Sequence, residues 1–210
     1  MLVTAGPTRE FFDSVRFISN PSSGRMGYAI AEAALSRGHE VVLVSGPVAI
    51  QPPEGVAFVP VVAAEEMFAA ATTAFESCGA AIMTAAVCDY RPSRRLPHKL
   101  KKQARSRQIT LKPTRDICAH LGRIKGKRVV IGFAMEDHDE RLHAEAKLAR
   151  KQCDAIVLNG IGNVGSQDAT VAFVTADGRW SEPITGSKQQ VAVHVVQLAE
   201  RLSRDRSKGR

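Results

Sequence analysis

Residues 1–37 read MLVTAGPTREFFDSVRFISNPSSGRMGYAIAEAALSR, and this stretch decides the fold. It contains a short apolar run at 2–5, a connection of about twenty residues and an amphipathic stretch at 26–37. Short apolar runs are typical of buried strands, and apolar residues that recur every three or four positions indicate a helix. The stretch therefore predicts a strand and a helix that are joined by an unusually long loop.

The same alternation of strand and helix patterns continues along the chain. Further strands are expected at 41–45, 56–61, 80–86, 128–134, 154–158 and 170–175, and further helices at 64–77, 115–121, 139–152 and 187–202. This order predicts right-handed crossovers and a doubly wound, Rossmann-like α/β fold, with a mostly parallel sheet and helices on both faces. We find no internal linker, so we expect one domain over 1–202 and a frayed basic tail over 203–210.

Composition excludes several classes of protein. Hydrophobic residues make up 44% of the 210 residues and charged residues 24%, which is typical of a globular chain. No apolar run approaches the roughly 18 residues that a membrane span needs, and the N-terminus does not have the pattern of a secretory signal. The four cysteines form no C-x-x-C pair, which favours reduced thiols over a disulfide framework or a zinc site. We therefore expect a cytoplasmic protein that does not bind membranes.

Positive charge is concentrated in one segment. The chain has a net charge of +8, but residues 91–128 contain fourteen Lys or Arg and a single acid, Asp116. This segment carries +13, and the rest of the chain carries −5. A duplex-binding protein usually has a basic stripe on the motif that enters the groove, whereas one cationic segment on a mildly acidic body favours a site for a small anion.

The long first loop is a candidate for that anion site. In a doubly wound sheet, ligands bind beyond the carboxyl ends of the strands, near the point where the strand order reverses. Ser22 and Ser23 are natural helix N-caps. Together with Gly24 they place hydroxyls and free backbone N–H groups at the start of a helix, which suits a phosphate. On residue type alone, simple capping is the more common role of such serines.

A series of short sequence blocks, in order along the chain, resembles a known family. Residues 4–10 read T-A-G-x-T-x-E, residues 13–20 read D-x-V-R-x-I-x-N and residues 22–27 read S-S-G-x-M-G. Later blocks lie at 44–48, 85–92, 99–102, 116–117 and 132–136, followed by Lys147, Lys151, Asn159 and 187–188. Over essentially the whole chain, these blocks resemble phosphopantothenate–cysteine ligase (phosphopantothenoylcysteine synthetase), which is often fused to a flavin-dependent decarboxylase.

The resemblance implies ligation of L-cysteine to 4'-phosphopantothenate in coenzyme A biosynthesis. In the family's reaction the carboxylate attacks the α-phosphate of a nucleoside triphosphate, and the cysteine amine then displaces the nucleoside monophosphate. The motif wording resembles that of bacterial members, so we expect CTP, Mg²⁺ and an acyl-CMP intermediate. Both steps need cations and N–H donors where negative charge develops, and the cationic segment meets that need. The chain lacks a decarboxylase part, so we expect no flavin.

The resemblance also implies a role for particular residues and for one segment. The expected catalytic residues are Asn20 and Arg16, at the acyl intermediate, and Lys99, at the triphosphate. Nucleotide contacts are implied for Ala85, Asp89, Lys99, Lys112, Pro113, Thr114, Arg115, Phe133, Lys147 and Lys151, with Mg²⁺ on Asp89 through the nucleotide. Phosphate or substrate contacts are implied for Ser22, Ser23, Gly24, Arg25 and Gly46. Family members are homodimers, and the segment at 92–112 is expected to be an arm that pairs with its twofold mate.

Each of these residue types also has an ordinary structural role. Lys147 and Lys151 are spaced to lie on one helix face, and by default they would be surface lysines. A bare K-L-K-K sequence is usually a solvated charged face. Phe133 after an apolar run would by default be core. Cys88, next to Asp89, is interpreted as a small buried filler because the implied mechanism needs no thiol nucleophile.

Two other functions stay open as alternatives. A nicotinamide-dependent oxidoreductase on a Rossmann-like sheet would have a short G-x-G-x-x-G turn after the first strand, and this chain has a long loop without that fingerprint. A nucleic-acid-binding module would have aromatic residues among its basic ones, yet aromatic residues make up only 5% of the chain. Binding of cofactor or DNA measured against salt would separate these alternatives.

Overall fold

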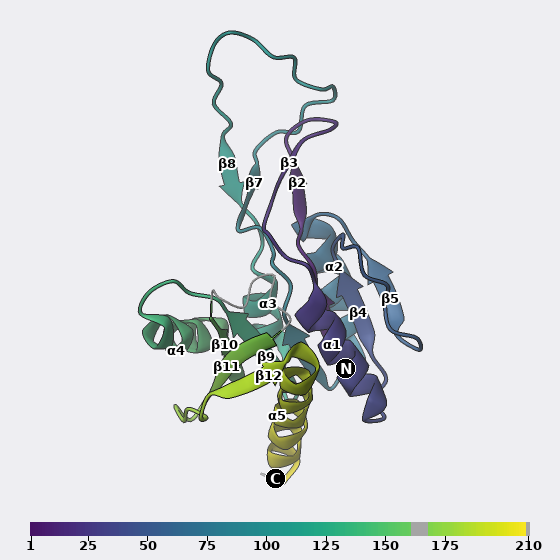
Figure 1. Ribbon diagram of the computed structural model, residues 1–210, viewed down its shortest axis with the longest axis vertical. Helices are drawn as coiled ribbons and strands as arrows, with labels where there is room; N and C mark the ends of the chain where they lie inside the picture. Colours follow the sequence, from purple (N-terminus) through teal and green to yellow (C-terminus); the bar gives the residue numbers. More distant parts are fainter. Residues whose placement is uncertain (161–167, 209–210) are drawn as a thin grey trace.

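A single eight-stranded sheet forms the centre of the computed structural model, which describes residues 1–160 and 168–208 (Figure 1). Its strands are β1 (Leu2–Ala5), β4 (Val42–Ser45), β5 (Ala57–Pro60), β6 (Ala80–Met83), β9 (Val129–Ala134), β10 (Ala155–Asn159), β11 (Asp168–Thr175) and β12 (Ile184–Ser187). They lie in the order β12-β11-β10-β9-β6-β1-β4-β5. The six strands from β10 to β5 are parallel, and only β11 and β12 are antiparallel to their neighbours.

This strand order confirms the expected doubly wound fold. Starting at β1, the chain moves outward to β4 and β5, then returns to the other side of β1 and moves outward through β6, β9 and β10. That path is the Rossmann order 3-2-1-4-5-6. The order therefore reverses between β1 and β6, and the carboxyl ends of these two strands mark the expected ligand crevice.

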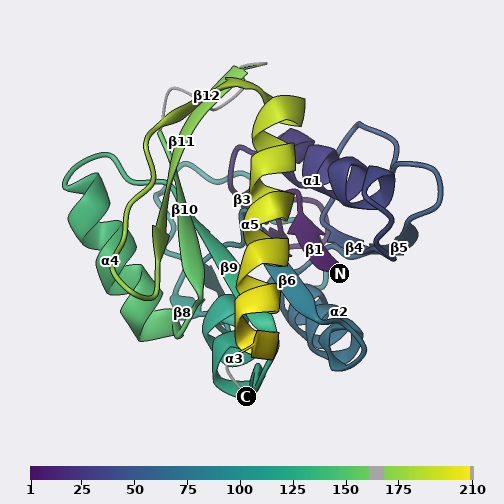
Figure 2. The same cartoon turned by 90° about the horizontal axis from the view of Figure 1, so that it is seen from below.

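Helices cover both faces of the sheet (Figure 2). On one face, α1 (Arg25–Ser36) packs against α5 (Lys188–Lys208), and on the other face lie α2 (Ala64–Glu76), α3 (Ile117–Ile124) and α4 (Glu140–Lys151). Val129 and Ile131 belong to the first apolar core and Val130 to the second. Successive side chains of a strand point to opposite faces, so burial on both faces explains the unbroken apolar run of β9.

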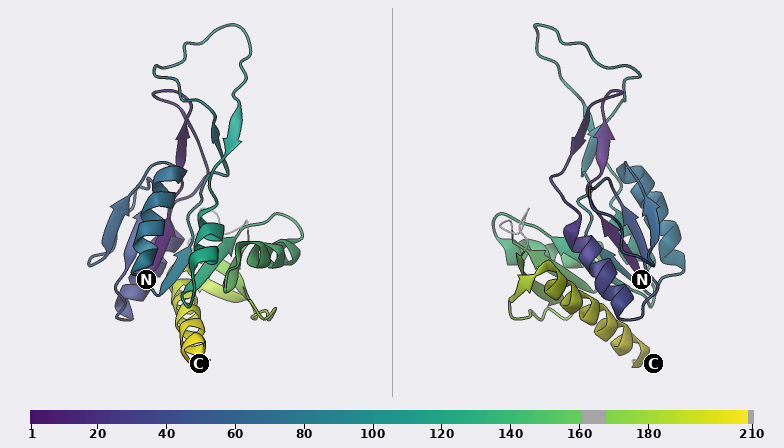
Figure 3. Two further views of the ribbon diagram at one scale, coloured as in Figure 1. Left: turned by 180° about the vertical axis from the view of Figure 1, so that it is seen from behind. Right: turned by 45° about the vertical axis from the view of Figure 1, so that its right-hand side comes forward.

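Two small ribbons extend from the carboxyl edge of the sheet (Figures 1 and 3). The first is the hairpin of β2 (Arg9–Phe11) and β3 (Phe17–Ser19), and the second pairs β7 (Tyr90–Pro92) with β8 (Leu111–Pro113). Residues 93–110, which connect β7 to β8, reach farthest from the body of the molecule. The long connection between β1 and α1 is therefore partly a hairpin. The expected arm at 92–112 belongs to the second ribbon and forms its long tip.

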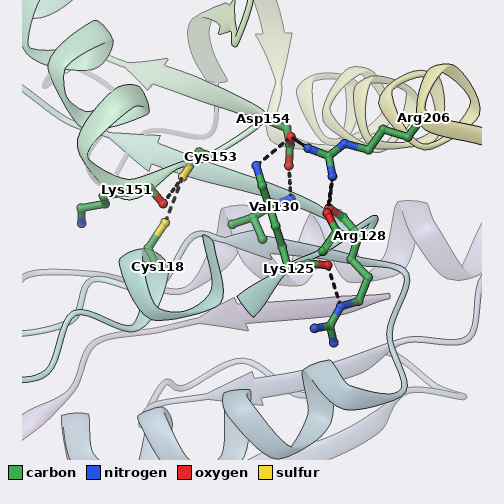
Figure 4. A network of polar contacts seen from close by, with 9 residues as sticks. Cys118, Lys125, Arg128, Val130, Lys151, Cys153, Asp154 and Arg206 are labelled. Atoms are coloured by element: carbon green, nitrogen blue, oxygen red, sulfur yellow. Dashed lines mark hydrogen bonds and ion pairs between the residues drawn. The ribbon is translucent and has the colours of Figure 1, made fainter. Parts of the chain in front are cut away.

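The C-terminal helix continues beyond the predicted end, which corrects the expected tail, and its Arg206 contacts the body of the molecule (Figure 4). α5 runs to Lys208, so residues 203–208 are helical, while 209–210 lie outside the described residues. The Arg206 guanidinium donates to the buried carboxylate of Asp154 and to the carbonyls of Gly126 (2.8 Å) and Arg128 (3.0 Å). A buried carboxylate needs charged partners, and this one holds the last turns of α5 against the sheet. In the described part of the chain no helix has the length and apolar character of a membrane span.

A candidate active site at the carboxyl ends of β1 and β6

A pocket of about 800 Å³ opens where the strand order reverses. It lies beyond β1 and β6, between the start of α1 and the side of α4. Most of the expected site residues line it: Asn20, Ser22, Ser23, Gly24, Arg25, Ala85, Asp89, Pro113, Thr114, Arg115, Phe133, Lys147 and Lys151. Residues from five separate parts of the sequence therefore meet at the place that the fold assigns to a ligand.

The start of α1 forms one wall of the pocket. Gly24 is the N-cap, with φ at 74°, and no side chain caps the helix. The expectation that Ser22 or Ser23 caps it is wrong, because the Ser22 hydroxyl instead accepts from the N–H of Gly24 (3.3 Å). The first N–H groups of a helix have no intrahelical partner, and here they face the pocket at the positive end of the helix dipole. This wall suits a phosphate.

Gly24 and Gly46 are required by the backbone itself. A Cβ on Gly24 would lie 2.8 Å from Val48 Cγ1, and the positive φ favours glycine in any case. A Cβ on Gly46 would lie 1.7 Å from the carbonyl oxygen of Pro7, so this position admits only glycine. Gly46 does not line the pocket, and its contribution is to let the loop after β4 approach the loop after β1.

The loop after β6 forms the floor. The sequence predicted a strand to residue 86, but β6 ends at Met83. The Thr84 hydroxyl donates to the carbonyl of Thr4 (2.5 Å), and the Ala86 N–H donates to the carbonyl of Gly6 (2.9 Å). No role was predicted for Thr84, although a polar residue directly after an apolar run is a signal that the strand ends there.

Asn20 ties the first loop to this floor. Its amide nitrogen donates to the carbonyls of Ala86 (3.3 Å) and Val87 (3.0 Å). The side chain lines the pocket, at the junction between the phosphate wall of α1 and the loop after β6. Its donors thus support the loop, and the acceptor oxygen is the remaining polar atom of the amide.

α4 provides a cationic wall. Lys147 and Lys151 are one helical turn apart and both line the pocket. Burial lowers the pKa of Lys147, and the neighbouring ammonium of Lys151 lowers it further. Lys151 Nζ lies 3.3 Å from a carboxylate oxygen of Asp116, the N-cap of α3. An ammonium in this setting is stabilised when a phosphate replaces water beside it.

The segments around β7 and β8 close the third side. The Thr114 N–H donates to the carbonyl of Asp89 (2.9 Å), and its hydroxyl donates to the carbonyl of Cys88 (2.6 Å). Arg115 pairs with Glu65 and stacks over the ring of Phe68, 3.5 Å from its centroid. The backbone is thereby fixed so that Asp89 and Thr114 face one pocket.

Cys88 is buried, as the sequence analysis expected. It is 4% exposed, and burial raises the pKa of its thiol. Its sulfur lies 3.6 Å from the carbonyl oxygen of Thr8 and 3.8 Å from that of Ile18. A raised pKa disfavours the thiolate, so this side chain is not suited to nucleophilic attack.

Arg16, Lys99 and Lys112 do not line the pocket. All three lie on the two ribbons that project from the body, Arg16 at the tip of the β2–β3 hairpin, Lys99 on the tip 93–110 and Lys112 in β8. The structure therefore brings together most of the expected phosphate and nucleotide contacts, without Gly46, Lys99 and Lys112, and it leaves two of the three expected catalytic residues outside.

A buried carboxylate holds the two ribbons together near Lys99. Asp13 accepts from the backbone N–H groups of Val15 (2.8 Å), Arg16 (2.7 Å) and Leu100 (3.0 Å), and Arg16 Nε lies 3.1 Å from it. Arg16 also donates to the carbonyl of Leu100. Burial on its own would raise the pKa of Asp13, but the N–H donors and the guanidinium outweigh it and lower that pKa to about 2. The residue after Lys99 is thus fixed to the hairpin at both its N–H and its carbonyl.

Several pocket residues had no assigned role in the sequence analysis. They are Thr4, Thr84, Val87, Tyr90, Cys118, Met135, Arg150 and Lys188, among others. Lys188 is buried, and burial followed by the nearby Arg25 lowers the pKa of its ammonium. The signal available in the sequence was that Lys188 belongs to the block 187–188, which carries the resemblance.

Comparisons with known proteins show the family to which the chain is similar. The family model of the DNA/pantothenate metabolism flavoprotein C-terminal domain matches residues 1–202. The chain is 40% identical over 209 residues to the coenzyme A biosynthesis bifunctional protein CoaBC of Bacillus subtilis (strain 168). That alignment covers 97% of this chain and 52% of the relative, so the chain spans about half of the relative's length.

Two solved structures are similar over nearly the whole chain. A crystal structure of the C-terminal domain of CoaBC has a TM-score of 0.85 at 39% identity and covers 97% of this chain and 95% of that chain. A Cab2 variant in complex with phosphopantothenate-cysteine has a TM-score of 0.78 at 16% identity and covers 96% and 86% of the two chains. At that identity, the second likeness concerns the fold alone.

Proposed function

The chain belongs to the family of the DNA/pantothenate metabolism flavoprotein C-terminal domain, and from this membership we propose that it is a phosphopantothenate–cysteine ligase of coenzyme A biosynthesis. Its substrates are 4'-phosphopantothenate, L-cysteine and CTP. The pantothenate carboxylate attacks the α-phosphate of CTP, which forms acyl-CMP and releases pyrophosphate. The amine of cysteine then attacks the acyl carbonyl, which forms the amide and releases CMP.

One observation carries this proposal: a phosphate-binding helix start and a cationic helix face each other across one pocket. The free N–H groups of α1 lie on one side, and Lys147 and Lys151 of α4 lie on the other. A triphosphate and a phosphorylated acid together carry more negative charge than either wall alone would balance. Two opposed electropositive walls therefore support a reaction that joins two phosphorylated substrates.

Asn20 and Asp89 have distinct roles in the proposed reaction. Asn20 lies between the phosphate wall and the loop after β6, where it positions the acyl group for the amine. Asp89 is a carboxylate in the same pocket. Mg²⁺ usually binds through one or two carboxylates together with substrate phosphates, and Asp89 fits that requirement. The metal, when bound, neutralises charge on the triphosphate.

We propose that Arg16 and Lys99 act when two copies of the chain associate through their ribbons. The ribbons expose apolar side chains that a monomer would leave in water: Val15 (54% exposed), Phe17 (39%), Tyr90 (57%), Ile109 (43%) and Leu111 (45%). Burial of such side chains favours association. A homodimer built in this way would bring the cationic tips to the pockets.

Product analysis tests the proposal. The protein is incubated with 4'-phosphopantothenate, L-cysteine, Mg²⁺ and either CTP or ATP, and the phosphorus-containing products are separated. We expect pyrophosphate and CMP in equal amounts with phosphopantothenoylcysteine, and faster turnover with CTP than with ATP. Release of inorganic phosphate together with CDP would indicate an acyl-phosphate route and would contradict the mechanism.

A further inference from the structure

Two buried thiols touch each other (Figure 4), and one of them, Cys118, lines the pocket. Cys118 Sγ and Cys153 Sγ are 3.4 Å apart, although the residues are 35 positions apart in sequence. Cys118 lies in the first turn of α3, and Cys153 lies between the end of α4 and the start of β10. Neither thiol has a place in the ligation chemistry.

The backbone leaves room for the pair. A Cβ on Gly132 of β9 would lie 3.3 Å from Cys118 Sγ and 3.5 Å from Cys153 Sγ. Both sulfurs therefore lie directly against this glycine of β9. A disulfide bond is about 2.05 Å long, so the two sulfurs would have to approach by roughly 1.4 Å to form one.

The two thiols differ in accessibility and in acidity. Cys118 lines the pocket, whereas Cys153 lies behind it. The hydrogen bond from Cys153 and the nearby ammonium of Lys151 lower the pKa of Cys118, although burial acts in the opposite direction. The same hydrogen bond, together with burial, raises the pKa of Cys153. Cys118 is therefore the more acidic thiol of the pair, and the more acidic thiol more readily forms the thiolate that attacks in disulfide exchange.

We propose that Cys118 and Cys153 are a redox pair that closes to a disulfide by exchange with a small disulfide entering through the pocket. In the first step Cys118 loses its proton and attacks one sulfur of the small disulfide, the S–S bond breaks, and the small thiolate that leaves takes up a proton. In the second step Cys153 attacks Cys118 Sγ, and the second small thiol leaves with the proton of Cys153. Two protein thiols are oxidised and one small disulfide is reduced to two thiols.

The bond would join two walls of the pocket. Cys118 follows Asp116, which pairs with Lys151 at the end of α4. Cys153 follows Lys151 by two residues. A disulfide would thus link the start of α3 to the turn after α4. Oxidation of the pair would therefore constrain two segments that border the pocket.

Cystine is the probe for the test. The reduced, folded protein is incubated with cystine, remaining thiols are blocked, and peptides are mapped by mass spectrometry without reduction. We expect a linked peptide that contains Cys118 and Cys153 and a whole-protein mass lower by two hydrogens. Absence of this linked peptide under conditions that oxidise a control dithiol, or a link that involves Cys78 or Cys88, would overturn the proposal.

Variants separate the two steps. Cys153→Ser should stop at one cysteine adduct on Cys118, and Cys118→Ser should gain no adduct while folded. An adduct on Cys153 in the Cys118→Ser protein would contradict entry through the pocket. Cys78→Ser is the matched control, because Cys78 is also buried but does not line the pocket, and it should form the linked peptide as wild type does. Circular dichroism verifies that each variant is folded. The linked-peptide test on the wild-type protein does not depend on these variants.

Discussion

Asn20 joins two loops and lines the pocket, so a substitution there tests whether its role is structural or belongs to the reaction. Its amide nitrogen donates to the carbonyls of Ala86 and Val87. Asn20→Asp retains the shape but loses both donors and places a negative charge beside an anionic intermediate. Activation depends mainly on the cations and should persist in part, whereas aminolysis should slow about 10²-fold, the scale for removal of one donor in a transition state. The variant should accumulate acyl-CMP, which mass spectrometry after a single turnover detects.

The control for Asn20 is a change that also removes a pocket hydrogen bond but adds no charge. Thr84→Val removes the hydroxyl that donates to the carbonyl of Thr4. It should slow both half-reactions to the same extent or not at all. If Asn20→Asp behaves in the same way as Thr84→Val, Asn20 is a structural loop residue.

Lys99 is exposed and lies on the tip 93–110, away from the core. If its ammonium stabilises charge on the triphosphate, Lys99→Gln should lower the rate of pyrophosphate formation roughly 10²-fold or more. Stability should change by less than about 0.5 kcal/mol, because exposed residues away from packed features contribute little. Pyrophosphate release in a coupled assay and thermal unfolding give the two readouts. Lys101→Gln, two residues along the same exposed tip, is the matched control.

At the scale of elements, Asp13 fastens the β2–β3 hairpin to the tip that carries Lys99. Asp13→Asn keeps the size but replaces a charged acceptor of three N–H groups with a neutral amide, one half of which is itself a donor. We expect trypsin to cleave the tip after Lys101 or Lys102 roughly tenfold faster, since hydrogen bonds to a charged group are lost. Glu54→Gln, at an exposed loop position, should leave the cleavage rate unchanged.

The same carboxylate gives this contact a defined pH dependence. The pKa of Asp13 is lowered from an ordinary value of 3.8 to about 2 in the folded chain. A lowered pKa contributes stability that is fully present above the ordinary pKa and is lost as the pH falls through about 2. The difference in Tm between wild type and Asp13→Asn should therefore be constant from pH 7 to about 5 and should shrink below pH 4. A difference that grows on acidification would contradict this assignment.

The sequence predicted the elements that are buried and apolar, and it missed the short strands that are partly exposed. The strand at 2–5 and its helix are present because burial on both faces leaves a continuous apolar signal. The two ribbons have strands of three residues each, partly exposed, so no periodicity marks them. The helix end at 202 was placed too early because the polar run 203–208 looks solvated, while Arg206 in fact reaches a buried carboxylate.

The expected site residues also fall into two groups, those that meet in the pocket and those that lie on the ribbons. Residues on loops that follow strands meet in the pocket, because the parallel order brings those loops to one edge of the sheet. Arg16, Lys99 and Lys112 were grouped with them by the resemblance, but their ribbons carry them outward. The Rossmann alternative lacked its glycine-rich turn, and the structure fills that connection with a hairpin.

At the scale of the whole molecule, the last turns of α5 are anchored to the sheet through Asp154. Asp154 accepts from Lys125 Nζ (2.9 Å), from the N–H of Val130 (2.8 Å) and from Arg206. Arg206→Ala leaves this buried carboxylate with one cation fewer and should lower the free energy of unfolding by about 1.5–3 kcal/mol. Arg204→Ala, at an exposed position on the same helix, should change it by less than about 0.5 kcal/mol. Urea unfolding followed by circular dichroism measures both, and equal effects would show that the contact adds nothing.

The projecting ribbons predict that a complete site needs two chains, because Asn20 lies in the pocket and Lys99 lies outside it. Asn20→Asp and Lys99→Gln should each be nearly inactive alone as homodimers. In a mixed dimer, the pocket that keeps Asn20 would face the partner's intact tip, so one of its two sites would work. Random exchange makes half of the dimers mixed, and activity should recover to about a quarter of wild type in a twofold dimer. If the tip instead folds onto its own pocket, every site carries one defect and mixing restores nothing. Turnover before and after mixing, with light scattering to follow the dimer, decides between the two arrangements.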